Sequence, residues 1–210
     1  MIILFDLDGT LIDSTEAILE SFAVAFETFG NDVPEDTLIK AEIGHPLDEM
    51  FKTLGVGEDK VWEYVDAYKM HYRQISCAKT VLLPEAKEAI DLASKYAILG
   101  IVTTKTAKYS IELLEHMGLM HYFEVLIGRE DVTYPKPHSE PIEKALAKLP
   151  SDTNKIWMVG DTCMDMLAAK AANVGSVGIT CGYGTKESLL ECTDNIYQNA
   201  LEAVQYIAKK

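Results

Sequence analysis

Five short, predominantly apolar runs recur along this chain and constrain its fold more than any other feature of the sequence. Apolar and polar residues do not alternate strictly in them, which is typical of strands covered on both faces, as in a parallel sheet. The runs lie at residues 2–7, 98–102, 123–127, 156–159 and 176–179. They predict a mainly parallel β-sheet.

Helical patterns fill most of the stretches between these runs, and the alternation predicts a doubly wound α/β fold. Pro84 suits the first turn of one helix, which is expected to run to about Tyr96. Thr106 is expected to cap the next helix, and Gly118 to end it. Further helical stretches are expected at 140–149, 164–172 and 200–209.

One segment interrupts the alternation, because no convincing strand occurs between about residues 14 and 79. Glycines divide this segment into pieces with helical spacing, in which Met50, Phe51 and Leu54 are expected core residues. The pieces lie at residues 14–29, 34–41, 46–54 and 58–73. We therefore predict an all-helical cap, residues 14–79, inserted into an α/β core of residues 1–13 and 80–210.

The charge of the chain limits its partners. Nineteen Lys and Arg against 33 Asp and Glu give a formal net charge of −14. This field repels nucleic acid and anionic membranes, so neither is an expected partner. It also repels phosphate esters, so an anionic substrate would need a local cation in its site. No apolar run approaches the ~20 residues of a membrane-spanning helix. We expect a cytoplasmic monomer or homodimer.

The four cysteines, Cys77, Cys163, Cys181 and Cys192, include no C-x-x-C pair. A structural zinc site is therefore not expected. Buried or idle thiols in a reducing cytosol are the expectation.

Polar residues follow four of the predicted strands. The carboxyl ends of parallel strands meet at one edge of an open α/β sheet, where ligands bind, so these residues should converge. In chain order they are Asp6, Asp8, Gly9 and Thr10; Thr103, Thr104 and Lys105; Arg129, Lys136 and Pro137; and Gly160, Asp161 and Asp165.

This combination of side chains suits phosphoryl transfer. Asp6 can attack phosphorus, because carboxylates act as nucleophiles in aspartyl-phosphate enzymes. Asp8 lies two positions on, which strand alternation would place on the same side, within reach of the leaving oxygen. Asp6 and Asp161 offer the hard oxygen ligands that Mg²⁺ prefers. Thr103 and Lys136 can hydrogen-bond the oxygens of the transferred group.

The turn after the first strand supplies two further candidates for binding the phosphate. Gly9 lets backbone amides approach a phosphate closely, because it has no Cβ. Thr10 follows it directly and is a second candidate.

Four ordered motifs resemble those of the haloacid dehalogenase superfamily, and the resemblance covers essentially the whole chain, including the helical insertion. They are Asp6-Leu-Asp-Gly-Thr10, Thr103 after an apolar run, Lys136-Pro137, and Gly160-Asp161 with Asp165. More narrowly, residues 137–141 and 181–184 look like the phosphoglycolate phosphatase-like branch.

The resemblance implies a role for each matching residue. Asp6 would be the nucleophile and a Mg²⁺ ligand, and Asp8 the general acid and base with its backbone carbonyl on the metal. Asp161 would be the third protein ligand, and Asp165 would complete the metal site, acting mainly behind the ligands. Dehalogenases of this superfamily lack the second aspartate and phosphonate-cleaving relatives replace it, so Asp8 indicates phosphate esters.

Other interpretations remain open for residues of the predicted core. Thr104 could take the phosphate contact in place of Thr103. Lys136 could be a surface lysine before a turn proline, although a lysine is a good point-charge partner for phosphate. Asp165 could simply stabilise the first turn of its helix. Gly182 and Gly184 are interpreted as turn glycines.

Two cap residues are candidate contacts for the rest of the substrate. His45, between Gly44 and Pro46, could reach into the site or be a surface histidine. Arg73 could hold a substrate carboxylate or be a solvated cation at a helix end.

The sequence thus predicts a Mg²⁺-dependent phosphatase that hydrolyses a small-molecule phosphate monoester through an aspartyl-phosphate, with phosphoglycolate the leading substrate. An inorganic pyrophosphatase and a sugar phosphomutase are the alternatives. A non-catalytic binding protein on this fold would be expected to lack the nucleophile, and Asp6 is present.

Overall fold

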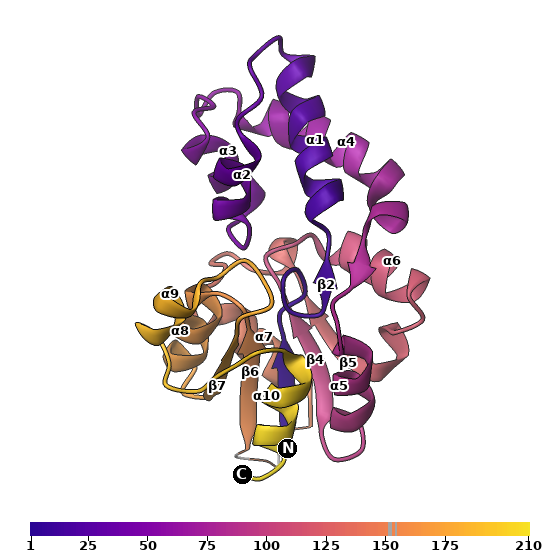
Figure 1. Ribbon diagram of the computed structural model, residues 1–210, viewed down its shortest axis with the longest axis vertical. Helices are drawn as coiled ribbons and strands as arrows, with labels where there is room; N and C mark the ends of the chain where they lie inside the picture. The colour runs from indigo at the N-terminus through magenta and orange to yellow at the C-terminus, as the bar shows by residue number, and fades with distance from the viewer. Residues whose placement is uncertain (151–152, 154) are drawn as a thin grey trace. The chain divides into compact units, whose positions relative to one another are not determined.

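The computed structural model describes residues 1–150, 153 and 155–210, and within them the chain forms two units (Figure 1). One unit comprises Met1–Asp13 and Leu82–Lys210, and the other comprises Ser14–Val81. The short strands β2 (Ile12–Asp13) and β3 (Val81–Leu82), where the chain passes from one unit to the other, pair in a two-stranded sheet.

A six-stranded sheet forms the centre of the first unit. Its strands are β1 (Ile2–Phe5), β4 (Ile98–Val102), β5 (Phe123–Ile127), β6 (Ile156–Gly160), β7 (Gly175–Ile179) and β8 (Ile196–Tyr197). They lie in the order β5-β4-β1-β6-β7-β8, and every neighbouring pair runs parallel. The predicted parallel α/β sheet is confirmed. The two-residue strand β8 is too short to have been recognised as an apolar run.

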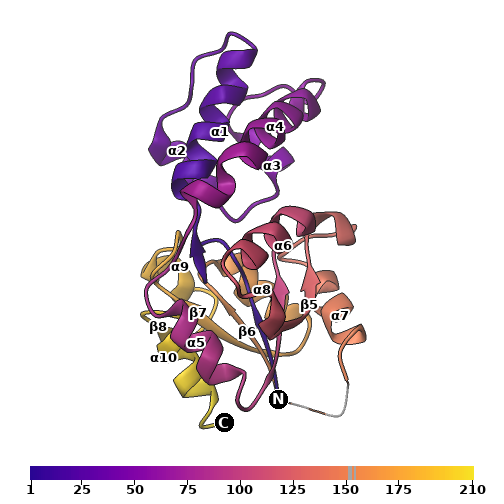
Figure 2. The same ribbon diagram turned by 90° about the vertical axis from the view of Figure 1, so that its right-hand side faces the viewer.

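Helices cover both faces of this sheet. They are α5 (Ala86–Ala93), α6 (Ala107–His116), α7 (Glu140–Ala147), α8 (Cys163–Ala171), α9 (Lys186–Leu190) and α10 (Ala200–Ile207). Two 3-10 turns, Met120–Tyr122 and Arg129–Asp131, flank β5. Figure 2 shows α5 and α10 on the opposite side of the sheet from α7.

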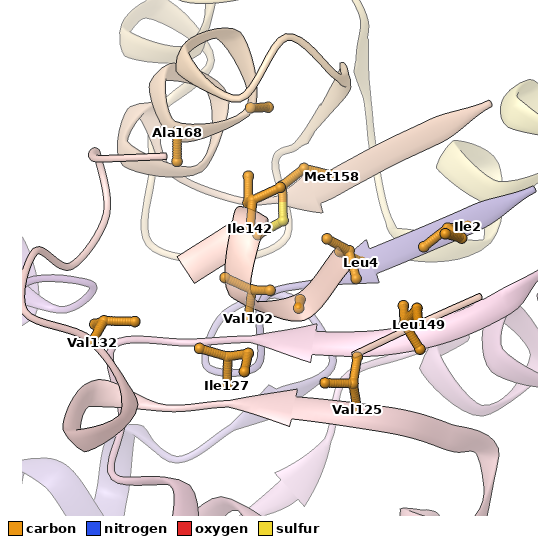
Figure 3. Close-up of a cluster of buried hydrophobic side chains, with 12 residues drawn as sticks. Ile2, Leu4, Val102, Val125, Ile127, Val132, Ile142, Leu149, Met158 and Ala168 are labelled. Carbon is orange, nitrogen blue, oxygen red and sulfur yellow. The ribbon is translucent and has the colours of Figure 1, made fainter. Parts of the chain in front are cut away.

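The core between the sheet and helices α7 and α8 holds β1 in place (Figure 3). Ile2 and Leu4 of β1 are almost wholly buried there. They share the cluster with Val102, Val125, Ile127, Val132, Ile142, Ala145, Leu149, Met158, Ala168 and Ala169. Because β1 is central in the sheet and packed on this face, the residues that follow Phe5 start from a fixed point.

Four helices form the second unit: α1 (Thr15–Thr28), α2 (Asp36–Glu42), α3 (Leu47–Thr53) and α4 (Val61–Lys79). Phe51 is fully buried, and its ring contacts those of Phe22, Phe26, Tyr64 and Tyr68. Edge-to-face and tilted pairs of this kind suit aromatic side chains. Phe51 is therefore a core residue, as its helical spacing predicted.

The predicted boundaries of two helices were wrong. Helix α4 continues to Lys79, because residues 74–79 contain no glycine or proline, so Arg73 lies in its interior and not at its end. Helix α5 begins only at Ala86, because Glu85 adopts a left-handed conformation with φ 62°.

The predicted cap at Thr106 was also wrong, since its side chain makes no capping hydrogen bond. The carboxylate of Glu130, from the turn after β5, accepts from the Ala107 N–H at 2.8 Å instead. A side chain from another loop thus satisfies the start of α6.

The expectation of idle thiols was wrong for two of the four cysteines. Cys163 and Cys192 form a disulfide with Cα atoms 5.7 Å apart, and Cys77 and Cys181 are free. The pair is 29 residues apart in sequence, and the turn through β7 and α9 returns the chain to the start of α8. Within the described part of the chain, no helix is both long and apolar enough for a membrane span.

Candidate active site

The register of the sheet brings Asp6 and Asp161 to the same edge. Phe5 pairs with Ile101 of β4 on one side and Val159 of β6 on the other. The Asp6 N–H donates to the Val159 carbonyl at 2.9 Å, so Asp6 stands one step beyond the end of β1. Asp161 directly follows β6, and the two carboxylates meet although the sequence separates them widely.

Three carboxylates and one ammonium form the centre of the site. Oxygen atoms of Asp6, Asp161 and Asp165 lie within 4.8 Å of one another, and all three residues are buried. Lys136 Nζ lies 2.9 Å from Asp6 Oδ1 and 2.5 Å from Asp165 Oδ1, and it donates to the Val102 carbonyl at 3.1 Å. If all four groups are ionised, the cluster carries two net negative charges.

Burial and mutual repulsion shift the titration of this cluster. Burial raises the pKa of Asp6 to about 6, with Lys136 opposing the rise and Asp165 adding to it. Burial, followed by repulsion from Asp165 and Asp6, raises the pKa of Asp161 to about 8. Burial acts to lower the pKa of Lys136, but attraction to Asp165 and Asp6 outweighs it, so that pKa is raised. The protein alone holds more negative charge here than it neutralises.

The donor set fits a divalent cation. Among the described residues, no donor makes a hydrogen bond of acceptable geometry to the buried Asp6 Oδ1, despite the ion pair with Lys136. The Asp165 oxygens are occupied: Oδ1 accepts from Lys136, and Oδ2 accepts from the N–H and hydroxyl of Thr162. Asp6 therefore has the clearest spare capacity for a metal, and the three carboxylates together form a group that could hold one.

The carboxylate of Asp161 is oriented by groups from two other loops. The Thr10 hydroxyl donates to Oδ1 at 3.0 Å, and the Tyr183 N–H donates to Oδ2 at 2.8 Å. A Cβ on Gly9 or Gly182 would overlap Oδ2, and one on Gly184 would overlap the Asp161 carbonyl. Because these glycines have no Cβ, the backbone of their two loops can lie close to Asp161.

The interpretation of Gly182 and Gly184 as turn glycines was therefore incomplete. Only their resemblance to the phosphoglycolate phosphatase-like branch signalled a role, because sequence spacing cannot show what a glycine packs against. Gly9 and Thr10 also use their N–H groups inside the turn, donating to the carbonyls of Ile12 and Leu7.

Asp8 faces a different cation from Asp6. Its Oδ2 lies 2.9 Å from Lys105 Nζ, in an ion pair that is largely buried. Strand alternation does not place Asp8, because β1 ends at Phe5 and the carbonyl of Leu7 accepts three turn hydrogen bonds. The sequence places Lys105 among the residues that follow a strand, but it does not indicate that Asp8 is its partner.

The remaining sequence candidates are placed as follows. Thr103 is buried, and its hydroxyl oxygen accepts from the Lys105 N–H at 3.2 Å, while Thr104 is half-buried. His45 and Arg73 lie in the helical unit. The His45 side chain is 42% exposed and its Nδ1 lies 3.2 Å from the Glu42 carbonyl oxygen, and Arg73 is exposed on α4.

Comparison with known proteins decides the family. The family model described as haloacid dehalogenase-like hydrolase matches residues 3–179. The chain belongs to this family. A haloacid dehalogenase-like hydrolase from Streptococcus pneumoniae superposes with a TM-score of 0.87 at 29% identity, covering 98% of this chain and 97% of that one. The resemblance seen in the sequence motifs is confirmed.

Two curated relatives carry more specific names. A Clostridium perfringens protein named "Putative pyrophosphatase PpaX" is 32% identical, over 99% of this chain and 97% of its own length. A Colwellia psychrerythraea protein named phosphoglycolate phosphatase is 31% identical, over 90% of this chain and 88% of its own length.

The raised pKa values predict how the stability of the metal-free protein depends on pH. The folded-state pKa values of Asp6 and Asp161 lie above the ordinary 3.8, so the folded state binds more protons than the unfolded state. The stability from these groups is present below about pH 4 and is lost as the pH rises through about 6 and about 8. Asp161→Asn should therefore raise the melting temperature of the metal-free protein relative to wild type at pH 8, and much less at pH 5.

Differential scanning fluorimetry with and without Mg²⁺ measures this effect. Mg²⁺ should stabilise wild type more at pH 8 than at pH 5, and should have little effect on Asp161→Asn. Asp32→Asn, an exposed change of the same type, serves as the control. An Asp161→Asn protein that is equally destabilised at both pH values would show that the buried carboxylates do not repel one another.

Proposed function

We propose that this chain is a Mg²⁺-dependent phosphatase that hydrolyses a small-molecule phosphate monoester through an aspartyl-phosphate on Asp6. The observation that carries the proposal is the buried group of Asp6, Asp161 and Asp165 around Lys136, which carries two net negative charges when all four groups are ionised. A nucleophilic carboxylate, a cation for the phosphoryl oxygens and a set of metal ligands thus occupy one site.

In the proposed first step, the Asp6 carboxylate attacks phosphorus and the bond from phosphorus to the leaving oxygen breaks. Asp8 gives that oxygen a proton. In the second step, Asp8 takes a proton from a water molecule, whose oxygen attacks phosphorus and releases the Asp6 carboxylate and orthophosphate. The hydroxyl of Thr103 and the ammonium of Lys136 bind the phosphoryl oxygens, where charge accumulates.

Asp6 and Asp161, with the backbone carbonyl of Asp8, would hold Mg²⁺. The bound ion would neutralise the carboxylates and stabilise charge on the phosphoryl oxygens. In this proposal Asp165 fixes Lys136 through the 2.5 Å ion pair, and the Thr10 hydroxyl and Tyr183 N–H fix Asp161. The protein thus orients each reacting group before the substrate arrives.

The two units would divide the work. The α/β unit, residues 1–13 and 80–210 in our assignment, would carry the phosphoryl chemistry. The helical insertion, residues 14–79, would act as a cap that contacts the leaving group and excludes water. We place phosphoglycolate first among substrates, supported by the similarity to the Colwellia enzyme of that name. Inorganic pyrophosphate is the alternative, supported by the similarity to the Clostridium perfringens protein.

Phosphate release tests the reaction. With 2-phosphoglycolate, pyrophosphate and 4-nitrophenyl phosphate as substrates, orthophosphate should appear with Mg²⁺ and stop in excess chelator. Ca²⁺ should support the reaction poorly, because its longer and looser coordination misplaces the Asp6 carboxylate. Full turnover in excess chelator would contradict the metal requirement. An isomerised sugar phosphate without orthophosphate would indicate a phosphomutase.

The two aspartates of the first motif should respond differently to the same substitution. Asp6→Asn removes the nucleophile and should abolish turnover of every substrate. Asp8→Asn removes proton transfer and should slow alkyl phosphates by roughly 10²- to 10⁴-fold, but aryl phosphates with good leaving groups much less. Steady-state kcat measures both effects. Near-normal activity of Asp6→Asn would rule out the covalent mechanism.

The cap prediction concerns His45 and Arg73. If the substrate carries a second anionic group, one of these side chains should pair with it, and losing such a contact costs ~1.5–3 kcal/mol. His45→Ala or Arg73→Ala should lower kcat/KM for 2-phosphoglycolate by roughly 10- to 100-fold and leave 4-nitrophenyl phosphate nearly unchanged. Lys52→Ala, an exposed cation of the same unit, is the control. An unchanged ratio of the two activities in both variants would remove these residues from the specificity assignment.

A further inference from the structure

Lys105 is the second lysine of the α/β unit whose ammonium pairs with a candidate catalytic carboxylate. Lys136 Nζ contacts Asp6 and Asp165, whereas Lys105 Nζ contacts Asp8 Oδ2 at 2.9 Å. The Lys105 side chain is 10% exposed and that of Asp8 is 13% exposed. Nearby low-dielectric protein strengthens such a pair relative to one in open solvent.

The backbone of Lys105 is fixed on both sides. Its N–H donates to the Thr103 hydroxyl at 3.2 Å, and its carbonyl accepts from the Arg129 N–H at 3.0 Å. A Cβ on Gly128 would overlap Ala107, so the first residue of α6, two positions beyond Lys105, packs directly against the loop after β5. The ammonium is therefore presented to Asp8 from a rigid base rather than from a mobile surface chain.

Asp8 lies in a turn, so strand geometry does not fix the direction of its side chain. The chain has left β1 at Phe5, so the carboxylate needs another group to set its direction. A general acid and base must lie within hydrogen-bond reach of the atom it serves, and a misplacement of about 1 Å can cost on the order of 10²-fold in rate. The ion pair with Lys105 supplies this constraint.

We propose that Lys105 is a positioning residue that holds the Asp8 carboxyl group through Oδ2, in the direction needed for its other oxygen to carry the proton given to the leaving oxygen and later taken from water. The inference rests on the proposed phosphatase function and assigns the two lysines to different atoms. Lys136 binds the transferred phosphoryl group, and Lys105 orients the side chain of Asp8.

Two aryl esters of nearly the same shape test this assignment. Phenyl phosphate has a poor leaving group that needs a proton, and 4-nitrophenyl phosphate has a good one that does not. Lys105→Met keeps most of the apolar stem and removes the charge. With Mg²⁺ present, it should lower kcat for phenyl phosphate by roughly 10- to 100-fold, and kcat for 4-nitrophenyl phosphate by less than about 3-fold. Lys108→Met, which removes an exposed lysine from the start of α6, is the matched control and should change neither.

The double variant separates positioning from a direct role. If Lys105 acts only through Asp8, Lys105→Met should add almost no further loss to Asp8→Asn. An equal loss on both esters that persists in the Asp8→Asn background would place Lys105 on the phosphoryl group and overturn the inference. Unchanged kcat on both esters would also overturn it.

An unfolded variant and an inactive wild-type protein can each be distinguished from a wrong role for Lys105. Circular dichroism checks that Lys105→Met is folded. If it is not, Lys105→Arg, which keeps the charge but displaces it, carries the test and should slow phenyl phosphate more than 4-nitrophenyl phosphate. Equal kcat changes on the two esters in that variant would reject the inference. Wild-type protein that releases no phosphate from either ester would reject the proposed function itself, and the role of Lys105 with it.

Discussion

Repulsion among three buried carboxylates is the constraint on which the site depends. Asp6, Asp161 and Asp165 are held within 4.8 Å of one another, and Lys136 neutralises only part of their charge. Burying three acids costs free energy in a protein of formal charge −14, and a further cation beside Lys136 would reduce that cost. The same unneutralised charge makes the site suitable for a divalent metal, and burial together with repulsion from the neighbouring carboxylates raises the pKa values of Asp6 and Asp161.

The parallel sheet makes this crowding possible. β1 lies between β4 and β6 and is packed on α7 and α8, so Asp6 cannot retreat from Asp161 without disrupting the core. Hydrogen bonds from Thr10 and Tyr183 hold Asp161, and Gly9 and Gly182 leave room for its carboxylate. Favourable packing of the core therefore offsets the electrostatic cost of burying these carboxylates, as expected of functional sites.

The sequence predicted the fold well where local pattern decides it. The runs at 98–102 and 123–127 match β4 and β5 residue for residue, because the residues of a parallel strand that face the core must be apolar. It predicted the members of the carboxylate cluster because strand ends converge. It could not predict the Lys105–Asp8 pair, the capping of α6 by Glu130, or the Cys163–Cys192 bond. Each of these joins loops whose proximity is fixed only by tertiary packing.

The covalent role proposed for Asp6 can be measured directly. Enzyme in excess over substrate, mixed with Mg²⁺ and quenched in acid over a series of times, is digested and analysed by mass spectrometry. If Asp6 is the nucleophile, a phosphoryl group should appear transiently on the peptide that carries Asp6, reach a higher level in Asp8→Asn, and be absent in Asp6→Asn. Complete release of orthophosphate by wild type and Asp8→Asn, with that peptide unmodified at every time point or another residue modified in its place, would contradict the mechanism.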